Sequence, residues 1–494
     1  MSVVQGNPPQ GSRGVAGHMS WQGMSMLVQA CAQFGVTAAL ARLLAPEDFG
    51  LIAAANIAIT FVQVIAEGGI GSAIVQRKEL DSSFIGAAMA VALMVGVGCY
   101  LLLALCAFPF QSFFAMDRLG VVVIVLGLSS LLSGTCGVLE GLLQRELRFA
   151  SLFRVTLVTS IVGYAAPALI LALAGAGVWS LVVAALGRVL VKCIMLATLA
   201  PNVIRPRWEG DAIRDIARFG FGLTQDRFWL WLAAQSAPFL IGRFFGQAQL
   251  GQFYMGSQLA VLPAQYISSV VSAVYFPMVS RAMADRARVG FQFIALIVSA
   301  FLLMTAFGVV LAINAEFIIN AVYGDGWSGA ILVFEVLCIG AGFRAGTQIC
   351  DALNIARGDV YALAGRRMLS AGIMVLAVYV VRKYGLYEVA WAVTVSQATM
   401  FVMTIALAVK GLGLHRDSFK PFGLRTILVV VLLVVINSML LLLRNHGLVG
   451  GIPLLALSAI ANGVSLLPVL LATVRWMNGP GVLSTDRKHL VGGG

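Results

Sequence analysis

The sequence predicts an all-α integral membrane protein with about 14 transmembrane helices. Three observations support this fold class: 60% of the 494 residues are hydrophobic, only 11% are charged, and apolar runs recur along the whole chain. A soluble protein carries roughly a quarter charged residues. Backbone polar groups cannot remain unpaired in hydrocarbon, so membrane spans must be helices or a closed barrel. Barrel strands alternate apolar and polar residues over about ten positions, whereas these runs are continuous, so we expect helices.

The predicted spans are long enough to cross about 30 Å of hydrocarbon. All seven cysteines fall within them, and an odd number at such depth indicates helix packing rather than a disulfide framework. The four histidines lie in tails or connections without metal-ligand spacing. We therefore expect no metal and no cofactor. The apolar runs fall near 20–43, 49–70, 84–108, 119–141, 152–174, 178–200, 219–244, 250–276, 290–313, 328–350, 363–381, 386–409, 423–443 and 449–474.

The basic residues predict the orientation of these spans. The two tails and the even-numbered connections hold 23 of the 33 Lys and Arg, and the odd-numbered connections hold 6. By the positive-inside rule, both termini are expected in the cytoplasm. The net charge of +12 then reflects cytoplasmic loops that face anionic membrane lipids, and it requires no nucleic acid.

The longest connection divides the chain into two halves. Within it, Ile213, Ile216 and Phe219 recur every three residues, with charged residues on the other side, which predicts an amphipathic helix at the membrane surface. The expected organisation is a disordered cytoplasmic tail (1–18), an N-lobe of six spans (19–200), a cytoplasmic amphipathic linker (201–218), a C-lobe of six spans (219–410), two further spans (411–475) and a cytoplasmic tail (476–494).

An internal repeat supports this division. At an offset of 201 residues, Arg42 aligns with Arg243 and Gly50 with Gly251, each pair at a span boundary. A second match aligns Leu139–Gln144 with Cys350–Ile355, and each segment lies at the end of the fourth span of its half. Two halves in the same orientation predict a two-fold axis along the membrane normal, with a binding site between the halves.

Several segments resemble one family of membrane transporters. The chain is similar to the polysaccharide transporter branch of the MOP exporter superfamily, the Wzx-like O-antigen and exopolysaccharide flippases, through roughly its first 280 residues. The segments that carry the resemblance are ARLLAPEDFG (41–50), GIGSAIVQRK (69–78), GLLQRELRF (141–149), GAGVWSL (175–181), IGRFFG (241–246) and FPMVSR (276–281).

This resemblance implies two six-helix lobes, two extra C-terminal helices and alternating access to a central cavity. It further implies a flippase in a bacterial inner membrane that moves an undecaprenyl-diphosphate-linked oligosaccharide repeat unit from the cytoplasmic to the periplasmic leaflet. Partners are then this lipid-linked oligosaccharide and membrane lipids, with docking by other polysaccharide-assembly proteins left open. A basic cavity would suit an acidic, xanthan-type repeat unit, although the diphosphate alone could account for it.

Charged residues inside the predicted spans are the first candidates for a site, because each costs about 2.5–3.5 kcal/mol at the bilayer centre. We expect a hydrated cavity that receives an anionic substrate, or else neutralisation by nearby acids and snorkelling of the lysine. Three acids are candidates either for ion coupling or for structural ion pairs. The basic residues are Arg188, Lys192, Arg227 and Arg344, and the acidic ones are Glu67, Asp226 and Glu335.

Polar residues also follow single helix faces. Asn56, Thr60 and Gln63 are spaced for one face of the second span, and Gln29 belongs to a similar series in the first. Such a stripe either lines a groove that accepts sugar hydroxyls or joins helices through hydrogen bonds. We expect the groove, with all eight basic and polar residues as its substrate-binding set.

Three other functions compete with the flippase. A multidrug or cation antiporter of the same superfamily would favour acidic cavity residues, and the spans here lean basic. A peptidoglycan-precursor flippase would share a cationic cavity. A membrane polysaccharide polymerase would need catalytic residues on a sizeable outer loop, and the outer connections here are short. No Walker A motif is present, so we expect a transporter without ATPase activity and no catalytic residues.

Overall fold

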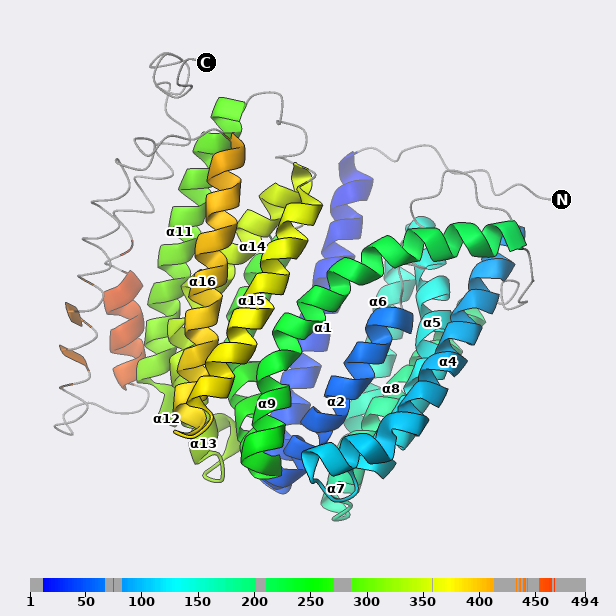
Figure 1. Ribbon diagram of the computed structural model, residues 1–494, viewed down its shortest axis with the longest axis horizontal. Helices are drawn as coiled ribbons and strands as arrows, with labels where there is room; N and C mark the ends of the chain where they lie inside the picture. Colours follow the sequence, from blue (N-terminus) through cyan, green and yellow to red (C-terminus); the bar gives the residue numbers. More distant parts are fainter. Residues whose placement is uncertain are drawn as a thin grey trace. The chain divides into compact units, whose positions relative to one another are not determined.

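The computed structural model describes residues 12–66, 74, 82–200, 210–270, 286–357 and 359–412, together with short pieces between 432 and 466. Every element that these residues form is a helix (Figure 1). The chain divides into two compact units. The N-terminal unit comprises residues up to Trp231 plus Gly246–Gly251, and the C-terminal unit comprises Leu232–Phe245 and the chain from Gln252 onward.

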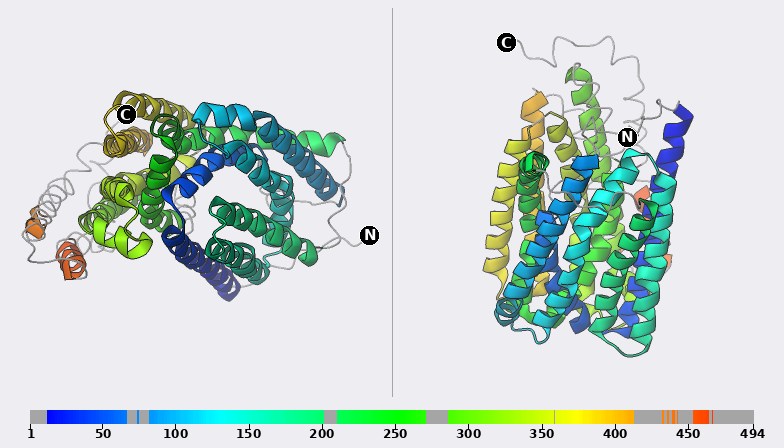
Figure 2. Two further views of the ribbon diagram at one scale, coloured as in Figure 1. Left: turned by 90° about the horizontal axis from the view of Figure 1, so that it is seen from below. Right: turned by 90° about the vertical axis from the view of Figure 1, so that its right-hand side faces the viewer.

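Apart from the first part of α9, the helices of the N-terminal unit run alongside one another in a bundle (Figure 2). Helix α4 packs along α5, and α5 packs against both α2 and α8. The fifth predicted span is not one continuous α-helix, because the π-helix η1 lies between α6 and α7. The elements are α1 (Ser12–Leu43), α2 (Pro46–Ala66), α4 (Ser82–Phe114), α5 (Leu119–Arg145), α6 (Phe149–Val158), η1 (Thr159–Ala165), α7 (Ala166–Leu173), α8 (Val178–Leu199) and the first part of α9 (Gly210–Val270).

The C-terminal unit contains the parts of α9 that the N-terminal unit does not, together with the helices that follow it in the chain. Helix α9 is broken at Gly246, whose φ of 83° suits glycine, so it combines the seventh and eighth predicted spans. The tenth predicted span is bent by 50° between α13 and α14. The further elements are α11 (Arg286–Ile313), α12 (Ala315–Tyr323), α13 (Ser328–Ile339), α14 (Ala341–Ala356), α15 (Val360–Val381) and α16 (Leu386–Leu412).

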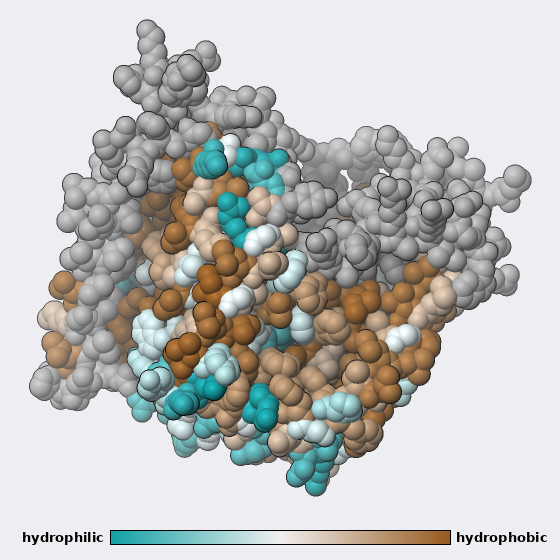
Figure 3. Space-filling view, viewed as in Figure 1, coloured by the Kyte–Doolittle hydropathy of each residue, from teal (hydrophilic) through white to brown (hydrophobic). Residues whose placement is uncertain are grey.

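The helices have the length and composition of membrane spans. Among the described residues, eight are long and apolar enough to cross a membrane, or nine if the bent pair α13–α14 counts as one span. In Figure 3 hydrophobic residues cover the flank of α4, and hydrophilic residues gather towards the ends of α15 and α16. The predicted all-α membrane fold is confirmed. Of the two C-terminal spans, the apolar helix Pro453–Gly463 is described, and most of the remainder lies outside the described residues, as do most of the two tails.

The start of α2 follows from its sequence. Pro46 occupies the first helical turn, where its missing N–H costs nothing, and Glu47 and Asp48 favour the positive end of the helix dipole. The Asp48 carboxylate accepts a hydrogen bond from the backbone N–H of Ala45 at 3.3 Å. The segment 41–50, which carries the family resemblance, therefore encodes a helix start.

The same segment forms a reciprocal helix crossing with Gly246–Gly251 of α9. A Cβ atom on Gly50 would collide with the backbone of Gln247, and one on Gly251 would collide with that of Pro46. Gln247 is the repeat equivalent of Pro46, and Gly251 is that of Gly50. Each glycine therefore meets the residue that lies four positions before the other glycine. The Gln247 amide also donates to the Glu47 carbonyl at 2.8 Å. The contact is therefore self-complementary in the way that an isologous contact is.

Two side chains fasten the helices of the C-terminal unit. The buried Gln252 accepts a hydrogen bond from the Ala330 N–H at 2.9 Å and donates to the Gly326 carbonyl at 3.0 Å, which caps the start of α13. The buried Asn314, after α11, donates to the Ser458 hydroxyl at 3.1 Å. The latter bond attaches the helix Pro453–Gly463 to this unit.

Candidate functional site

Arg188 lies at the middle of α8, about 16 Å from either end at 1.5 Å per residue. The preceding residue, Gly187, packs directly on the π-helix η1, since a Cβ atom there would lie 2.6 Å from the Gly163 carbonyl oxygen. This close approach fixes the position of Arg188 beside η1, and π-helices occur frequently at functional sites. Of the residues that the structure describes, none forms an ion pair with the half-buried Arg188.

Lys192, one turn further along α8, forms an ion pair with Glu140 of α5. The Lys192 Nζ and Glu140 Oε2 atoms are 2.7 Å apart, and the two side chains are 37% and 33% exposed. The expected alternative for Lys192 was snorkelling to the membrane surface. The Lys192 ammonium instead pairs with the Glu140 carboxylate of a neighbouring helix, and about a third of the surface of each side chain stays accessible. The sequence did not mark Glu140 as a site residue.

The polar stripe of α2 is half-buried, while most of the remaining helix is fully buried. The Thr60 hydroxyl donates to the Asn56 carbonyl at 2.6 Å and accepts a hydrogen bond from the Trp231 indole N–H at 3.0 Å. Trp231 also packs on Phe61, with ring centroids 5.0 Å apart. Thr60 thus joins α2 to α9, whereas the side chains of Asn56 and Gln63 remain the accessible part of the stripe.

Two other predicted site residues of the N-terminal unit, Arg227 and Gln29, occupy different surroundings. Arg227 is half-buried at the beginning of the aromatic cluster that includes Phe228, and Gln29 is half-buried on α1, which packs against the fifth span. The structure therefore places Gln29, Asn56, Thr60, Gln63, Arg188, Lys192 and Arg227 in the N-terminal unit.

Arg344 lies in the C-terminal unit and donates to acceptors of three other helices. Its guanidinium bonds the Ala260 carbonyl at 3.0 Å, the Gln397 side-chain oxygen at 3.2 Å and the Leu337 carbonyl at 3.4 Å. The Leu337 carbonyl belongs to the last turn of α13, where the break before α14 removes helical donors. This arrangement favours a structural function for Arg344 over substrate binding.

The three candidates for ion coupling are less well defined. Glu67 and the side chain of Asp226 lie outside the described part of the chain. Glu335 is half-buried on α13 and takes part in interactions of the C-terminal unit. Ion coupling by these three acids stays a prediction.

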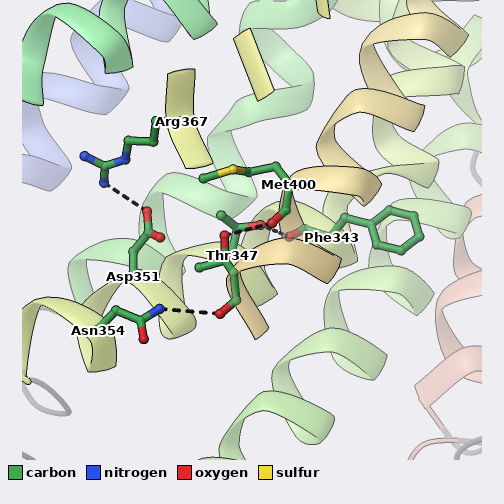
Figure 4. Close-up of polar contacts among 7 residues, drawn as sticks. Phe343, Thr347, Asp351, Asn354, Arg367 and Met400 are labelled. Atoms are coloured by element: carbon green, nitrogen blue, oxygen red, sulfur yellow. Dashed lines mark hydrogen bonds and ion pairs between the residues drawn. The ribbon is translucent and has the colours of Figure 1, made fainter. Parts of the chain in front are cut away.

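A second intramembrane ion pair, absent from the predictions, lies within the C-terminal unit. Arg367 of α15 donates to Asp351 of α14 at 3.1 Å, with side-chain exposures of 8% and 20% (Figure 4). On the same helix, Thr347 donates to the Phe343 carbonyl and the buried Asn354 donates to the Thr404 carbonyl. The only signal in the sequence was the second repeat match, which aligns Asp351 with Glu140.

The fold is that of a known class of membrane transporters. The chain resembles the lipid II flippase MurJ in its inward closed conformation, with a TM-score of 0.73 and 11% identity over 93% of this chain and 100% of MurJ. It also resembles an inward-facing MATE multidrug transporter of the MOP superfamily, with a TM-score of 0.60 and 13% identity over 80% of this chain and 98% of the other. It is thus a multi-pass membrane protein with the MOP transporter fold.

The family follows from the sequence comparison. Residues 39–332 match the family described as "Polysaccharide biosynthesis protein", and the chain belongs to it. A relative is the succinoglycan biosynthesis transport protein ExoT of Rhizobium meliloti (strain 1021), which is 27% identical over 285 residues, or 57% of either chain. The predicted fold and family are confirmed.

Proposed function

We propose that the protein flips an undecaprenyl-diphosphate-linked oligosaccharide repeat unit across a bacterial inner membrane, from the cytoplasmic to the periplasmic leaflet. Movement would follow alternating access, with both termini in the cytoplasm. Membership of the polysaccharide biosynthesis family supports the class of substrate, and the likeness to transporters supports the mode of movement.

The observation that carries this proposal is Arg188 at the centre of a membrane-spanning helix. A permanently charged guanidinium at this depth costs about 2.5–3.5 kcal/mol and needs a compensating anion or water. Within the described residues, α8 and its partner α5 carry one carboxylate, Glu140, and three cations, which are Arg188, Lys192 and, at the end of α5, Arg145. The remaining positive charge suits an anionic head group, and a diphosphate supplies one.

The polar face of α2 supports the sugar part of the substrate. Asn56 and Gln63 offer amide donors and acceptors that match sugar hydroxyls, and both belong to the same compact unit as Arg188. Moving a diphosphate and several sugars through hydrocarbon is prohibitive without such a polar path.

The test is translocation in proteoliposomes. Purified protein is reconstituted with undecaprenyl-diphosphate oligosaccharide that carries a fluorescent sugar, and a membrane-impermeant quencher reports the leaflet. Protein-dependent movement that falls strongly with Arg188→Gln supports the proposal. A matched control is Arg366→Gln, because Arg366 donates to the Ala362 carbonyl of its own helix at 3.0 Å. Absence of movement, with transport of a cationic dye instead, would assign the protein to multidrug export.

A further inference from the structure

We propose that Glu140 is the resident counter-ion of Lys192, and that the anionic head group of the substrate must displace it to bind. This inference rests on the proposed function and adds a specificity-determining residue to it. A lipid without negative charge cannot compete with the Glu140 carboxylate, so the pair would exclude neutral lipids from the site.

The pair lies inside the membrane-spanning helices. Glu140 is five residues before the end of α5 and Lys192 seven before the end of α8, which places them about 8 Å and about 10 Å from those ends. A separation of 2.7 Å means that the contact is fully formed. Lys192 is therefore neutralised when no substrate is bound, which removes the cost of an isolated ammonium ion at this depth.

The accessibility of the pair distinguishes it from a purely structural contact. Glu140 and Lys192 are 33% and 37% exposed, whereas the repeat-related acid Asp351 and its partner Arg367 are 20% and 8% exposed. Glu140 and Asp351 stand at corresponding places in the two halves, but the cation that pairs with Asp351, Arg367, is buried. Of these two pairs, the one on α5 and α8 is the pair that can exchange one anion for another without separating packed helices.

Arg188 explains why a substrate would win this exchange. It lies one turn from Lys192 on α8, and side chains four residues apart have Cβ atoms about 6 Å apart. The single carboxylate of Glu140 bonds Lys192, whereas a diphosphate has two charged groups that can engage Lys192 and Arg188 together. The bond from Lys192 to Glu140 is broken, bonds to phosphate oxygens form, and the freed carboxylate is hydrated.

The experiment measures binding of undecaprenyl diphosphate to the purified full-length protein in detergent, with undecaprenol as the neutral probe. Glu140→Gln should raise the affinity for the diphosphate about fivefold or more, because a competitor for Lys192 is lost, and this is the lower end of usual coupling strengths. Lys192→Gln should lower it. Glu140→Asp keeps the charge and should restore nearly the original affinity. Glu140→Gln should also bind undecaprenol better than the unmodified protein does, because the ion pair that excludes neutral lipids is lost, whereas Glu140→Asp should not.

Opposite effects of the two partners are the decisive result, because a merely structural ion pair would lose affinity when either partner is changed. An unchanged or lower affinity in folded Glu140→Gln protein, with normal binding by the unmodified protein, overturns the inference and leaves the proposed function intact. Failure of the unmodified protein to bind or move the diphosphate overturns both. Asp351→Asn serves as the matched control, and its folded fraction should bind with unchanged affinity.

Discussion

The ion pair between Asp351 and Arg367 is expected to be sensitive to the loss of either partner. Arg367→Met removes the cation that compensates the Asp351 carboxylate. The side chains of Arg367 and Asp351 are only 8% and 20% exposed. Removing one partner of a buried pair costs about 3–5 kcal/mol, since the remaining charge stays in a medium that solvates it poorly. The free energy of unfolding should fall by that amount.

The measurement is equilibrium unfolding in mixed detergent, followed by intrinsic fluorescence. Arg148→Met provides the control, because the pair of Arg148 with Glu146 is 41% and 49% exposed and such pairs contribute only about 0–1 kcal/mol. The double variant Asp351→Leu/Arg367→Met should recover much of the lost stability, because two apolar side chains need no compensation. Equal effects of Arg367→Met and Arg148→Met would refute the reasoning.

Three further predictions concern other contacts. Gly251→Ala should lower the free energy of unfolding by about 1–3 kcal/mol and reduce transport, because the new Cβ would lie 2.9 Å from the Gly50 nitrogen. The control is Gly137→Ala, where the added Cβ meets open space. This variant should leave both the unfolding curve and the transport rate unchanged. Arg344→Gln should lower both the free energy of unfolding and transport, whereas Arg188→Gln should lower transport alone. Unfolding and proteoliposome measurements on the same two variants check this. A stable but inactive Arg344→Gln protein would instead place Arg344 in the substrate-binding site. Gln252→Leu removes two hydrogen bonds at α13 and should cost roughly 1–3 kcal/mol; an unchanged unfolding curve would contradict this.

Composition and periodicity were sufficient to predict the helical membrane fold, because the cost of unpaired backbone groups in lipid leaves few alternatives. The starts of helices were also encoded locally, as the residues Pro46, Glu47 and Asp48 show. The repeat match of Gly50 with Gly251 had a direct physical basis in the reciprocal crossing. These features depend on neighbouring residues or on similarity within the chain, and a single sequence contains both.

The pairing of charges could not be predicted in the same way. Spacing places Arg188 and Lys192 on one face of α8, but it does not say which helix lies opposite, and Glu140 is 52 positions from Lys192. Arg344 resembled a cavity residue until its three carbonyl acceptors were known. The π-helix η1 precedes Pro167 and the bend lies at Gly340, so a proline and a glycine mark both positions, but the sequence does not give the form of either distortion.

The reciprocal crossing of α2 and α9 has a consequence for substitutions at its two glycines. Residue 50 of one segment lies against the counterpart of residue 46 in the other, on both sides of the crossing. A side chain at either glycine would meet the backbone of the opposite segment, which cannot withdraw unless a helix moves. A larger residue at one glycine therefore cannot be offset by a smaller residue at the other, because both positions already lack a side chain.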